Sequence, residues 1–170
     1  MMNKKIVAIA VSLIVIIATV VVYVIMNRPI SSATAVLRVD PSTASASIGQ
    51  NFTINLSISN VVDLFGYQIK LRWNPMMLDA INAAEKPFLK SGGSTWFVPK
   101  INNTVGYALV DCTLLSNVAG VNGSGILATV QFHVKTSGSC DLALYDTALL
   151  NSTENLIPHA VTSGRFSASP

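Results

Sequence analysis

An alternation of apolar and polar side chains runs through residues 52–59, which read Phe52-Thr53-Ile54-Asn55-Leu56-Ser57-Ile58-Ser59. Successive side chains of a strand point to opposite sides of a sheet, so a period of two predicts a half-buried β-strand. Asn51 and Asn55 then share the outer face of this strand. The stretch sets the fold class as β, and the rest of the chain repeats it.

The same alternation recurs twice. In residues 65–74 the apolar phase includes Tyr67, Ile69 and Trp73, and residues 127–134 repeat it with a shift of phase near Ala128 that predicts a bulge. Glycine, proline and asparagine turns separate further candidate strands, which are Ala35–Val39, Thr43–Ser47, Thr95–Val98, Val105–Leu115, Asp141–Tyr145 and Ala160–Ser167. About nine strands, with only a possible helical turn around Met76–Glu85, predict an all-β, two-sheet antiparallel sandwich of jelly-roll type.

The N-terminus carries an apolar segment without charge, Ile6–Met26. At 1.5 Å per residue, its 21 residues match the roughly 30 Å hydrocarbon core of a bilayer. We therefore expect residues 1–28 to be a transmembrane signal-anchor, 29–34 a short linker and 35–170 the β-sandwich domain. Two lysines precede the segment and one arginine follows it, which predicts a cytoplasmic N-terminus and an extracellular domain. Cleavage near Ala35, after which the domain would be secreted, is the alternative.

The formal net charge of +3 comes from the flanks of this segment, Lys4, Lys5 and Arg28. The chain from residue 36 onward holds 8 basic and 8 acidic residues, so the predicted domain is neutral overall. No basic stripe with interleaved aromatic residues is present, and we expect no nucleic-acid partner.

Two further features of the sequence indicate export. Asn-x-Ser/Thr tripeptides, the acceptors of N-glycosylation, predict a glycoprotein, and they begin at Asn51, Asn55, Asn102, Asn122 and Asn151. An even pair of cysteines in an oxidising compartment favours a disulfide between Cys112 and Cys140, with two buried free thiols as the alternative. The disulfide would bring Asp111 and Asp141 together, although two carboxylates alone are few ligands for calcium.

Catalytic and ligand chemistry is sparse. The two histidines have no recognisable nucleophile and acid beside them, because His133 lies on the polar phase of a strand and His159 follows a turn. We therefore expect no enzyme, no cofactor and no metal site. Trp73 is on the apolar phase, but Trp96 and Phe97 are neighbours, so one ring must face outward. That ring would either stack on a sugar or simply cover the sheet edge.

The order of these motifs resembles the cohesin domain, a module of cellulosome scaffolds related to cellulose-binding modules, over about Ala35–Ser169. The resemblance is carried by four segments, which are Gly49-Gln50-Asn51-Phe52 to Val61, Phe65-Gly66-Tyr67-Gln68 to Pro75 with Leu78, Gly125-Ile126-Leu127 to Lys135, and Gly164-Arg165-Phe166-Ser167. The chain reads Trp73-Asn74-Pro75 where many cohesins read Tyr-Asp-Pro, so one acidic group near the binding face is missing. The cysteines resemble those of single-domain, membrane-anchored surface proteins of archaea.

The resemblance implies a partner-binding face on the third, fifth, sixth and eighth strands of the family. Carried over by position, this face includes Gln68, Lys70, Arg72, Asn74 and Tyr107, with Asp111 on the same strand as Tyr107. The implied function is an extracellular binding module for a dockerin-type or other surface protein. Two alternatives remain, a polysaccharide-binding module using Trp96 or Phe97, and a structural protein of the cell envelope.

Overall fold

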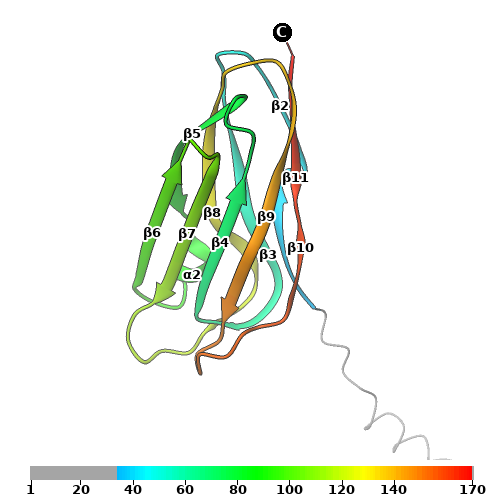
Figure 1. Ribbon diagram of the computed structural model, residues 1–170. Helices are drawn as coiled ribbons and strands as arrows, with labels where there is room; N and C mark the ends of the chain where they lie inside the picture. Colours follow the sequence, from blue (N-terminus) through cyan, green and yellow to red (C-terminus); the bar gives the residue numbers. More distant parts are fainter. Residues whose placement is uncertain (1–33, 170) are drawn as a thin grey trace, which may run out of the picture. The chain divides into compact units, whose positions relative to one another are not determined.

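The computed structural model describes residues 34–169, which fold into two packed β-sheets (Figure 1). Within these residues there are eleven strands and one short helix, in the order β1 (Ala35–Asp40), β2 (Thr43–Ser47), β3 (Asn51–Leu64), β4 (Gly66–Arg72), β5 (Leu78–Glu85), α2 (Pro87–Lys90), β6 (Thr95–Asn102), β7 (Tyr107–Leu114), β8 (Val121–Val134), β9 (Gly138–Leu150), β10 (His159–Thr162) and β11 (Gly164–Ser169). The predicted sandwich is confirmed. The expected count of about nine strands was too low.

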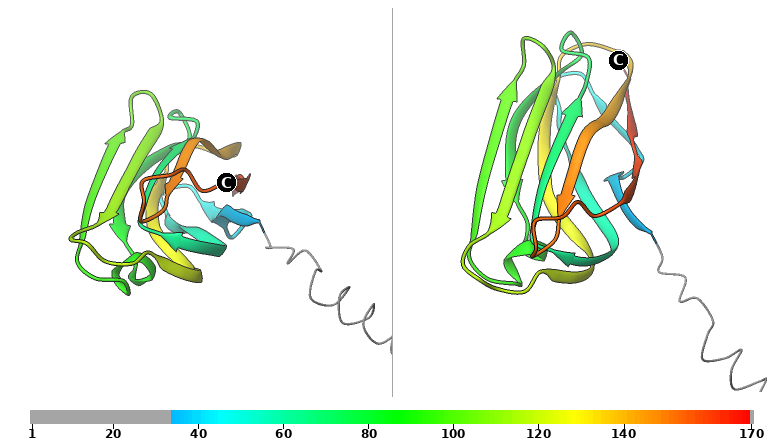
Figure 2. Two further views of the ribbon diagram at one scale, coloured as in Figure 1. Left: turned by 90° about the horizontal axis from the view of Figure 1, so that it is seen from below. Right: turned by 60° about the horizontal axis from the view of Figure 1, so that its bottom comes forward.

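One sheet has the strand order β10-β1-β3-β8-β5 and the other the order β2-β11-β9-β4-β7-β6. The two layers are visible from below in Figure 2. Both sheets are mixed, because β1 pairs with β10 and β2 pairs with β11 in parallel. The prediction of a purely antiparallel sandwich was wrong for this reason. The single strand expected at Ala160–Ser167 is divided at Ser163, and its two halves join different sheets.

The core lies between the sheets and is formed by the apolar phase of each strand. Aromatic rings gather in it, with Phe52 stacked on Phe166 at 4.3 Å and on Phe132 at 5.4 Å between ring centroids. Trp73 meets Phe132 edge-on at 5.1 Å, and its indole N–H donates to the Leu78 carbonyl. Trp73 is therefore a core residue, as predicted.

The predicted bulge is present on β8. Leu56 is opposite Ala128, and the next residue Ser57 is opposite Ile126, so Leu127 is the additional residue. A bulge of this kind shifts the side-chain phase by one position, which is the shift seen in the sequence.

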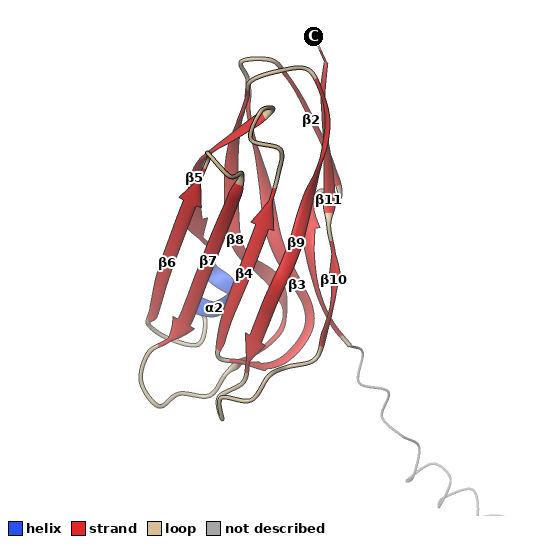
Figure 3. Cartoon of the chain, in the orientation of Figure 1, coloured by secondary structure: helices blue, strands red, loops and turns tan. Residues whose placement is uncertain are grey.

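The possible helical turn at Met76–Glu85 was wrong. Most of this segment is strand β5, which pairs with β8 and buries Leu78, Ala80 and Ala83. The short helix lies just beyond it at Pro87–Lys90, with proline in its first turn (Figure 3). Proline starts a helix readily, because its missing N–H is not needed there.

Residues Ala33–Pro170 form one compact unit, and both sheets and the whole described core belong to it. The predicted membrane anchor at residues 1–28 and residues 29–33 of the predicted linker lie outside the described residues. In residues 34–169, no helix is long and apolar enough to cross a membrane.

Candidate partner-binding face

Four neighbouring strands, β9, β4, β7 and β6, present an open outer surface that faces the viewer in Figure 1. We call this surface the outer face. Strand register aligns its side chains in four rows across the sheet. From one end to the other the rows are Asn102-Tyr107-Arg72-Ala143, Lys100-Leu109-Lys70-Tyr145, Val98-Asp111-Gln68-Ala148 and Trp96-Thr113-Gly66-Leu150.

Alternation decides which side chains reach this face. On β4, Tyr67, Ile69 and Leu71 are buried, so Gln68, Lys70 and Arg72 point outward as the sequence predicts. The phase of β7 was ambiguous in the sequence. Its buried residues, which include Val110 and Cys112, place Tyr107 and Asp111 on the outer side.

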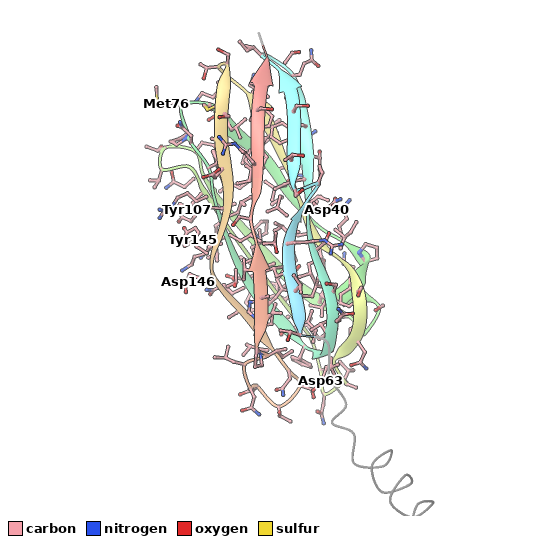
Figure 4. All side chains as sticks on the ribbon, turned by 90° about the vertical axis from the view of Figure 1, so that its right-hand side faces the viewer. Asp40, Asp63, Met76, Tyr107, Tyr145 and Asp146 are labelled. Atoms are coloured by element: carbon pink, nitrogen blue, oxygen red, sulfur yellow. The ribbon has the colours of Figure 1, made fainter. Side chains whose placement is uncertain are left out.

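The basic residues of β4 are each held by a neighbour on β9. The Lys70 ammonium forms an ion pair with Asp146, and this hydrogen bond raises the pKa of Lys70. The Arg72 guanidinium carbon lies 4.8 Å from the centroid of the Tyr145 ring. Figure 4 shows Tyr107, Tyr145 and Asp146 following one another down the same flank. These contacts limit the motion of two long side chains before any partner arrives.

Asp146 reaches Lys70 because of an irregularity in β9. Tyr145 is opposite Lys70 and Ala148 is opposite Gln68, so β9 has one more residue than β4 between these two pairs. Asp146 takes a left-handed backbone conformation with φ of 46°, which aspartate tolerates better than most residues. The bulge turns the carboxylate toward β4.

Asp111 lies near the middle of the outer face, between Val98 and Gln68 on the neighbouring strands. It is half-buried, and its Oδ1 atom is buried without a hydrogen-bond partner. Burial raises the pKa of the Asp111 carboxyl, while Lys100 and Lys70 act in the opposite direction. An unpartnered buried acceptor is unusual in a folded protein, because desolvation without a hydrogen bond costs free energy.

A groove of about 870 Å³ opens in the outer face, and its lining includes Asp111 of the third row and Trp96, Gly66 and Leu150 of the fourth row. Gly66 is among its lining residues and has no side chain to extend into it. Trp96 and Leu150 are on opposite sides, and Asn151 and Glu154 belong to the loop after β9 that borders it. Trp96 is 65% exposed, while Phe97 turns inward and packs against the core. The expectation that only one of these rings faces outward is confirmed.

Asn74 follows β4 and belongs to the adjoining turn. Its side-chain oxygen accepts the Met76 backbone N–H at 2.9 Å, and its backbone carbonyl accepts from Met77 and Leu78. Asn74 is exposed, but its side chain already has this structural role in the turn. It is therefore less free than Gln68 or Arg72 to contact a partner.

The predicted disulfide is wrong, since Cys112 and Cys140 are both free. Cys112 on β7 is opposite Tyr67 at one end of β4, whereas Cys140 on β9 lies beyond the level of Arg72 at the other end. Eight residue positions along the strands correspond to roughly 25 Å, which is far beyond the roughly 7 Å Cα limit of a disulfide. The same separation keeps Asp111 away from Asp141. No group of three potential metal ligands is found among residues 34–169.

The Cys112 thiol belongs to a small polar cluster between the sheets. It donates to Glu85 Oε1 at 3.5 Å, and the same carboxylate accepts from the Thr95 hydroxyl at 2.6 Å and pairs with Lys90 at 2.9 Å. Burial, followed by the nearby Glu85 charge, raises the pKa of Cys112 to about 12. The thiol is therefore an inert core group.

The two histidines each contact uncharged polar groups. His133 Nδ1 lies 2.8 Å from Asn51 Oδ1 on the five-stranded sheet. His159 Nδ1 lies 2.9 Å from the Ile157 carbonyl oxygen, and its Nε2 lies 2.9 Å from the Thr147 hydroxyl. Within the described residues, neither histidine is oriented by a carboxylate as a catalytic triad would require.

The five potential glycosylation sites divide between the two sheets. Asn51 and Asn55 are on β3 and Asn122 is on β8, both in the five-stranded sheet. Asn102 ends β6 in the first row of the outer face, and Asn151 borders the groove at the other end. Glycans at Asn51 and Asn55 would lie on the other sheet and leave the outer face clear, whereas glycans at Asn102 or Asn151 would border it.

Several residues of the outer face were missed in the sequence. Lys100 continues the alternation of Trp96 and Val98, so a longer prediction for β6 would have found it. Leu150 ends β9, beyond the strand predicted at Asp141–Tyr145, and Glu154 comes to the groove through the following loop, whose path has no sequence signal. Asp146 depends on the β9 bulge, which has none either.

A family model described as the cohesin domain matches residues 37–167. Among solved structures, a non-cellulosomal cohesin from the hyperthermophilic archaeon Archaeoglobus fulgidus has a TM-score of 0.67 at 18% identity, covering 81% of this chain and 93% of that one. CaCohA2 from Clostridium acetobutylicum gives 0.67 at 19%, covering 81% and 92%. The sixth cohesin of Acetivibrio cellulolyticus scaffoldin B, solved with a mutant Cel5 dockerin, gives 0.68 at 14%, covering 81% and 100%. No curated protein sequence matches the chain.

Proposed function

The chain belongs to the cohesin domain family, and on this premise we propose that it is a protein-interaction module that binds a dockerin-type or other surface protein on its outer face. The observation that carries the proposal is the preformed arrangement on β4 and β9. Arg72 and Lys70 are both held in place there, beside an open groove. Solved cohesins of the same fold are bound to dockerins. A binding module of this kind needs no catalytic group.

Preformed side chains favour binding because a partner need not order them. Association costs free energy for each flexible side chain that it immobilises, about 0.5–1.5 kcal/mol apiece. The Tyr145 ring already restricts Arg72, and Asp146 already restricts Lys70. Arginine and aromatic residues often supply most of the affinity of an interface. Arg72 is therefore the residue on which we expect partner binding to depend most.

We propose further that the module is displayed outside the cell by the N-terminal apolar segment. The support is the uncharged run Ile6–Met26 with two lysines before it and one arginine after it. Membrane fractionation of the full chain, followed by protease treatment of intact cells, tests this arrangement. Release of the domain into the medium would instead indicate cleavage near Ala35.

The binding proposal is tested with immobilised Ala33–Pro170, exposed to a surface extract of the source organism. Proteins retained on the wild-type domain are compared with those retained on Arg72→Glu. Arg38→Glu is the matched control, because Arg38 is an exposed arginine on β1 in the other sheet. A partner that is lost only with Arg72→Glu supports the proposal. A partner that Arg72→Glu retains would place binding elsewhere, and a domain that captures nothing would count against a protein partner.

Polysaccharide binding is the second candidate, and one observation favours it. Trp96 exposes 65% of its surface beside an open groove, and exposed aromatic rings can stack on sugars. Retention on insoluble polysaccharide that disappears in Trp96→Ala would support this function. Phe97 is no longer a candidate for stacking, because it faces the core.

A further inference from the structure

The groove on the outer face combines an apolar depression with an unpartnered carboxylate. Gly66 lines the groove, in the row across the sheet that has Trp96 at one end and Leu150 at the other. Asp111 lies in the next row; its Oδ1 atom is buried without a hydrogen-bond partner, but the residue is only half-buried, so a donor in the groove would approach the exposed side of the carboxylate. The depression can accept an unbranched apolar chain, and the carboxylate can accept a donor at the end of that chain.

The charges around the groove favour a cationic donor. Its charged lining residues are Lys100, Asp111 and Glu154, so the lining carries one net negative charge. In residues 34–169, no ion pair joins Asp111 or Glu154 to a basic side chain. The nearest basic residue of β4, Lys70, is already paired with Asp146. Lys100 also lines the groove, but it forms no ion pair with Asp111. A partner that brings a positive charge would therefore give the Asp111 carboxylate a direct contact that the described residues do not provide.

The exposed Trp96 adds a second reason. A cation close to the face of an indole ring is attracted by the ring's quadrupole, and tryptophan is the best of the aromatic residues in this role. The aliphatic stem of lysine or arginine also covers apolar surface while its charged head reaches a polar group. One side chain of this type can contact both the ring and the carboxylate.

We propose that this groove binds a lysine or arginine side chain of the protein partner, with its stem over Gly66 between Trp96 and Leu150 and its charged head on Asp111. The inference rests on the proposed function, since it assigns the partner chemistry of the same face. It makes Asp111 a specificity-determining residue. The neutral hydroxyl group of a partner serine or threonine is the competing donor, and the experiment separates the two.

The experiment uses three probes of equal length, hexylammonium, 1-hexanol and hexanoate, added to isotope-labelled Ala33–Pro170. That unit contains both sheets and the whole described core, so we expect it to fold on its own. The amide signals of Gly66, Asp111 and Thr113 and the Trp96 indole signal report occupancy. We expect hexylammonium to shift them with about fivefold tighter binding than 1-hexanol, and hexanoate to leave them unchanged.

Two variants and one control test the assignment to Asp111. Asp111→Asn keeps the shape of the side chain and should reduce the preference for hexylammonium over 1-hexanol to about one. Ala148→Leu adds side-chain volume to the groove lining and should abolish the shifts from all three probes. Asp141→Asn removes an exposed carboxylate outside the groove and should change nothing. Well-dispersed spectra verify that each variant is folded.

Equal binding of hexylammonium and 1-hexanol by the wild-type domain would overturn the inference in favour of a neutral donor. Absence of shifts at Gly66, Asp111 and Thr113 would overturn it outright. The proposed function fails separately. If Arg72→Glu releases a protein partner and Asp111→Asn retains it, the proposed function stands and the groove assignment is refuted. If the domain binds hexylammonium selectively but captures no protein partner, the groove binds cations and the proposed function is refuted.

Discussion

The guanidinium of Arg72 lies over the ring of Tyr145, with 4.8 Å between the guanidinium carbon and the ring centroid. The two residues come from adjacent strands, and Arg72 is exposed at the end of β4. The contact orients a charged group toward solvent without neutralising it. The outer face therefore presents a positioned cation whose importance for binding can be measured.

Arg72→Glu should raise the Kd of the captured partner by about 30-fold or more. This corresponds to a loss of about 2 kcal/mol of binding free energy, which is typical of an important interface residue. Tyr145→Leu keeps the charge but removes the cation–π contact, so its loss should be only about two- to fivefold. Titration calorimetry on both variants checks this order. A Tyr145→Leu effect as large as that of Arg72→Glu would mean that the partner contacts the ring itself.

Gly106→Ala should destabilise the domain strongly. Gly106 has a positive φ of 77°, and an added Cβ would lie 2.5 Å from the Trp73 carbonyl oxygen and 2.7 Å from Pro75. We expect a loss of about 3 kcal/mol in the free energy of unfolding, from backbone conformation and overpacking together. Gly49→Ala is the control, because its φ is 79° but nothing lies within 4 Å. Urea unfolding should show a loss of about 1 kcal/mol for this variant.

Phe166→Ala should cost about 4 kcal/mol, because the ring is fully buried and stacks on Phe52. Val62→Ala is the matched surface truncation, since Val62 is 66% exposed, and it should change the free energy of unfolding by less than about 0.5 kcal/mol. Similar denaturation midpoints for the two variants would contradict the assignment of Phe166 to the core.

Reducing agents should leave the melting temperature of the oxidised preparation unchanged, because Cys112 and Cys140 are too far apart to form a bridge. The raised pKa of Cys112, about 12, leaves about one thiolate in ten thousand at pH 8, so iodoacetamide should modify this thiol very slowly. Thermal unfolding with and without reducing agent measures the first effect, and mass spectrometry after alkylation measures the second. Rapid labelling of Cys112 in the folded domain would indicate local opening near Glu85.

Asp63 connects the end of β3 to two loops, and its replacement should lower stability in a pH-dependent way. Its carboxylate accepts the Ser152 hydroxyl, the Ser152 N–H and the Gly120 N–H, and these hydrogen bonds lower the pKa of Asp63. A lowered pKa in the folded state gives stability that is present above the ordinary aspartate value, near 3.9, and lost as pH falls through the folded value.

Asp63→Asn should therefore melt below the wild type at pH 6, and the difference should shrink as the pH falls through the lowered folded-state pKa of Asp63, below which both side chains are neutral. Thermal unfolding across this range measures it. Ser152→Ala removes the strongest of these hydrogen bonds and should show the same sign. A difference that persists unchanged at low pH would mean that packing, and not the carboxylate charge, connects the loops.

The sequence predicted most of the strands because period-two alternation is a local property. Strand β5 escaped because its residues, Leu78-Asp79-Ala80-Ile81-Asn82-Ala83-Ala84-Glu85, include alanine, leucine and glutamate, which favour helices. Pairing with β8 and burial against the core override that preference. Tertiary contacts of this kind are not visible in a single segment.

The sequence predicted which residues of β4 face outward in the candidate site, but not the contacts that these residues make. The outward positions of Gln68, Lys70 and Arg72 follow from alternation alone. The pairs Lys70–Asp146 and Arg72–Tyr145 depend on the register of β4 and β9 and on a bulge, so no local pattern reveals them. The cysteine prediction failed for the same reason, since two residues at a plausible spacing can lie at opposite ends of a sheet.

The parallel pairing of the first and last strands determines how the domain would respond to force. Ala35 pairs with His159 at one end and Ser47 with Ser169 at the other, so β1–β2 and β10–β11 run side by side (Figure 1). Tension applied at Ala35 and Ser169 would act along these strands. Their hydrogen bonds would then be loaded together in shear and could not open one after another like a zipper. A domain of this construction can hold a captured partner under mechanical load.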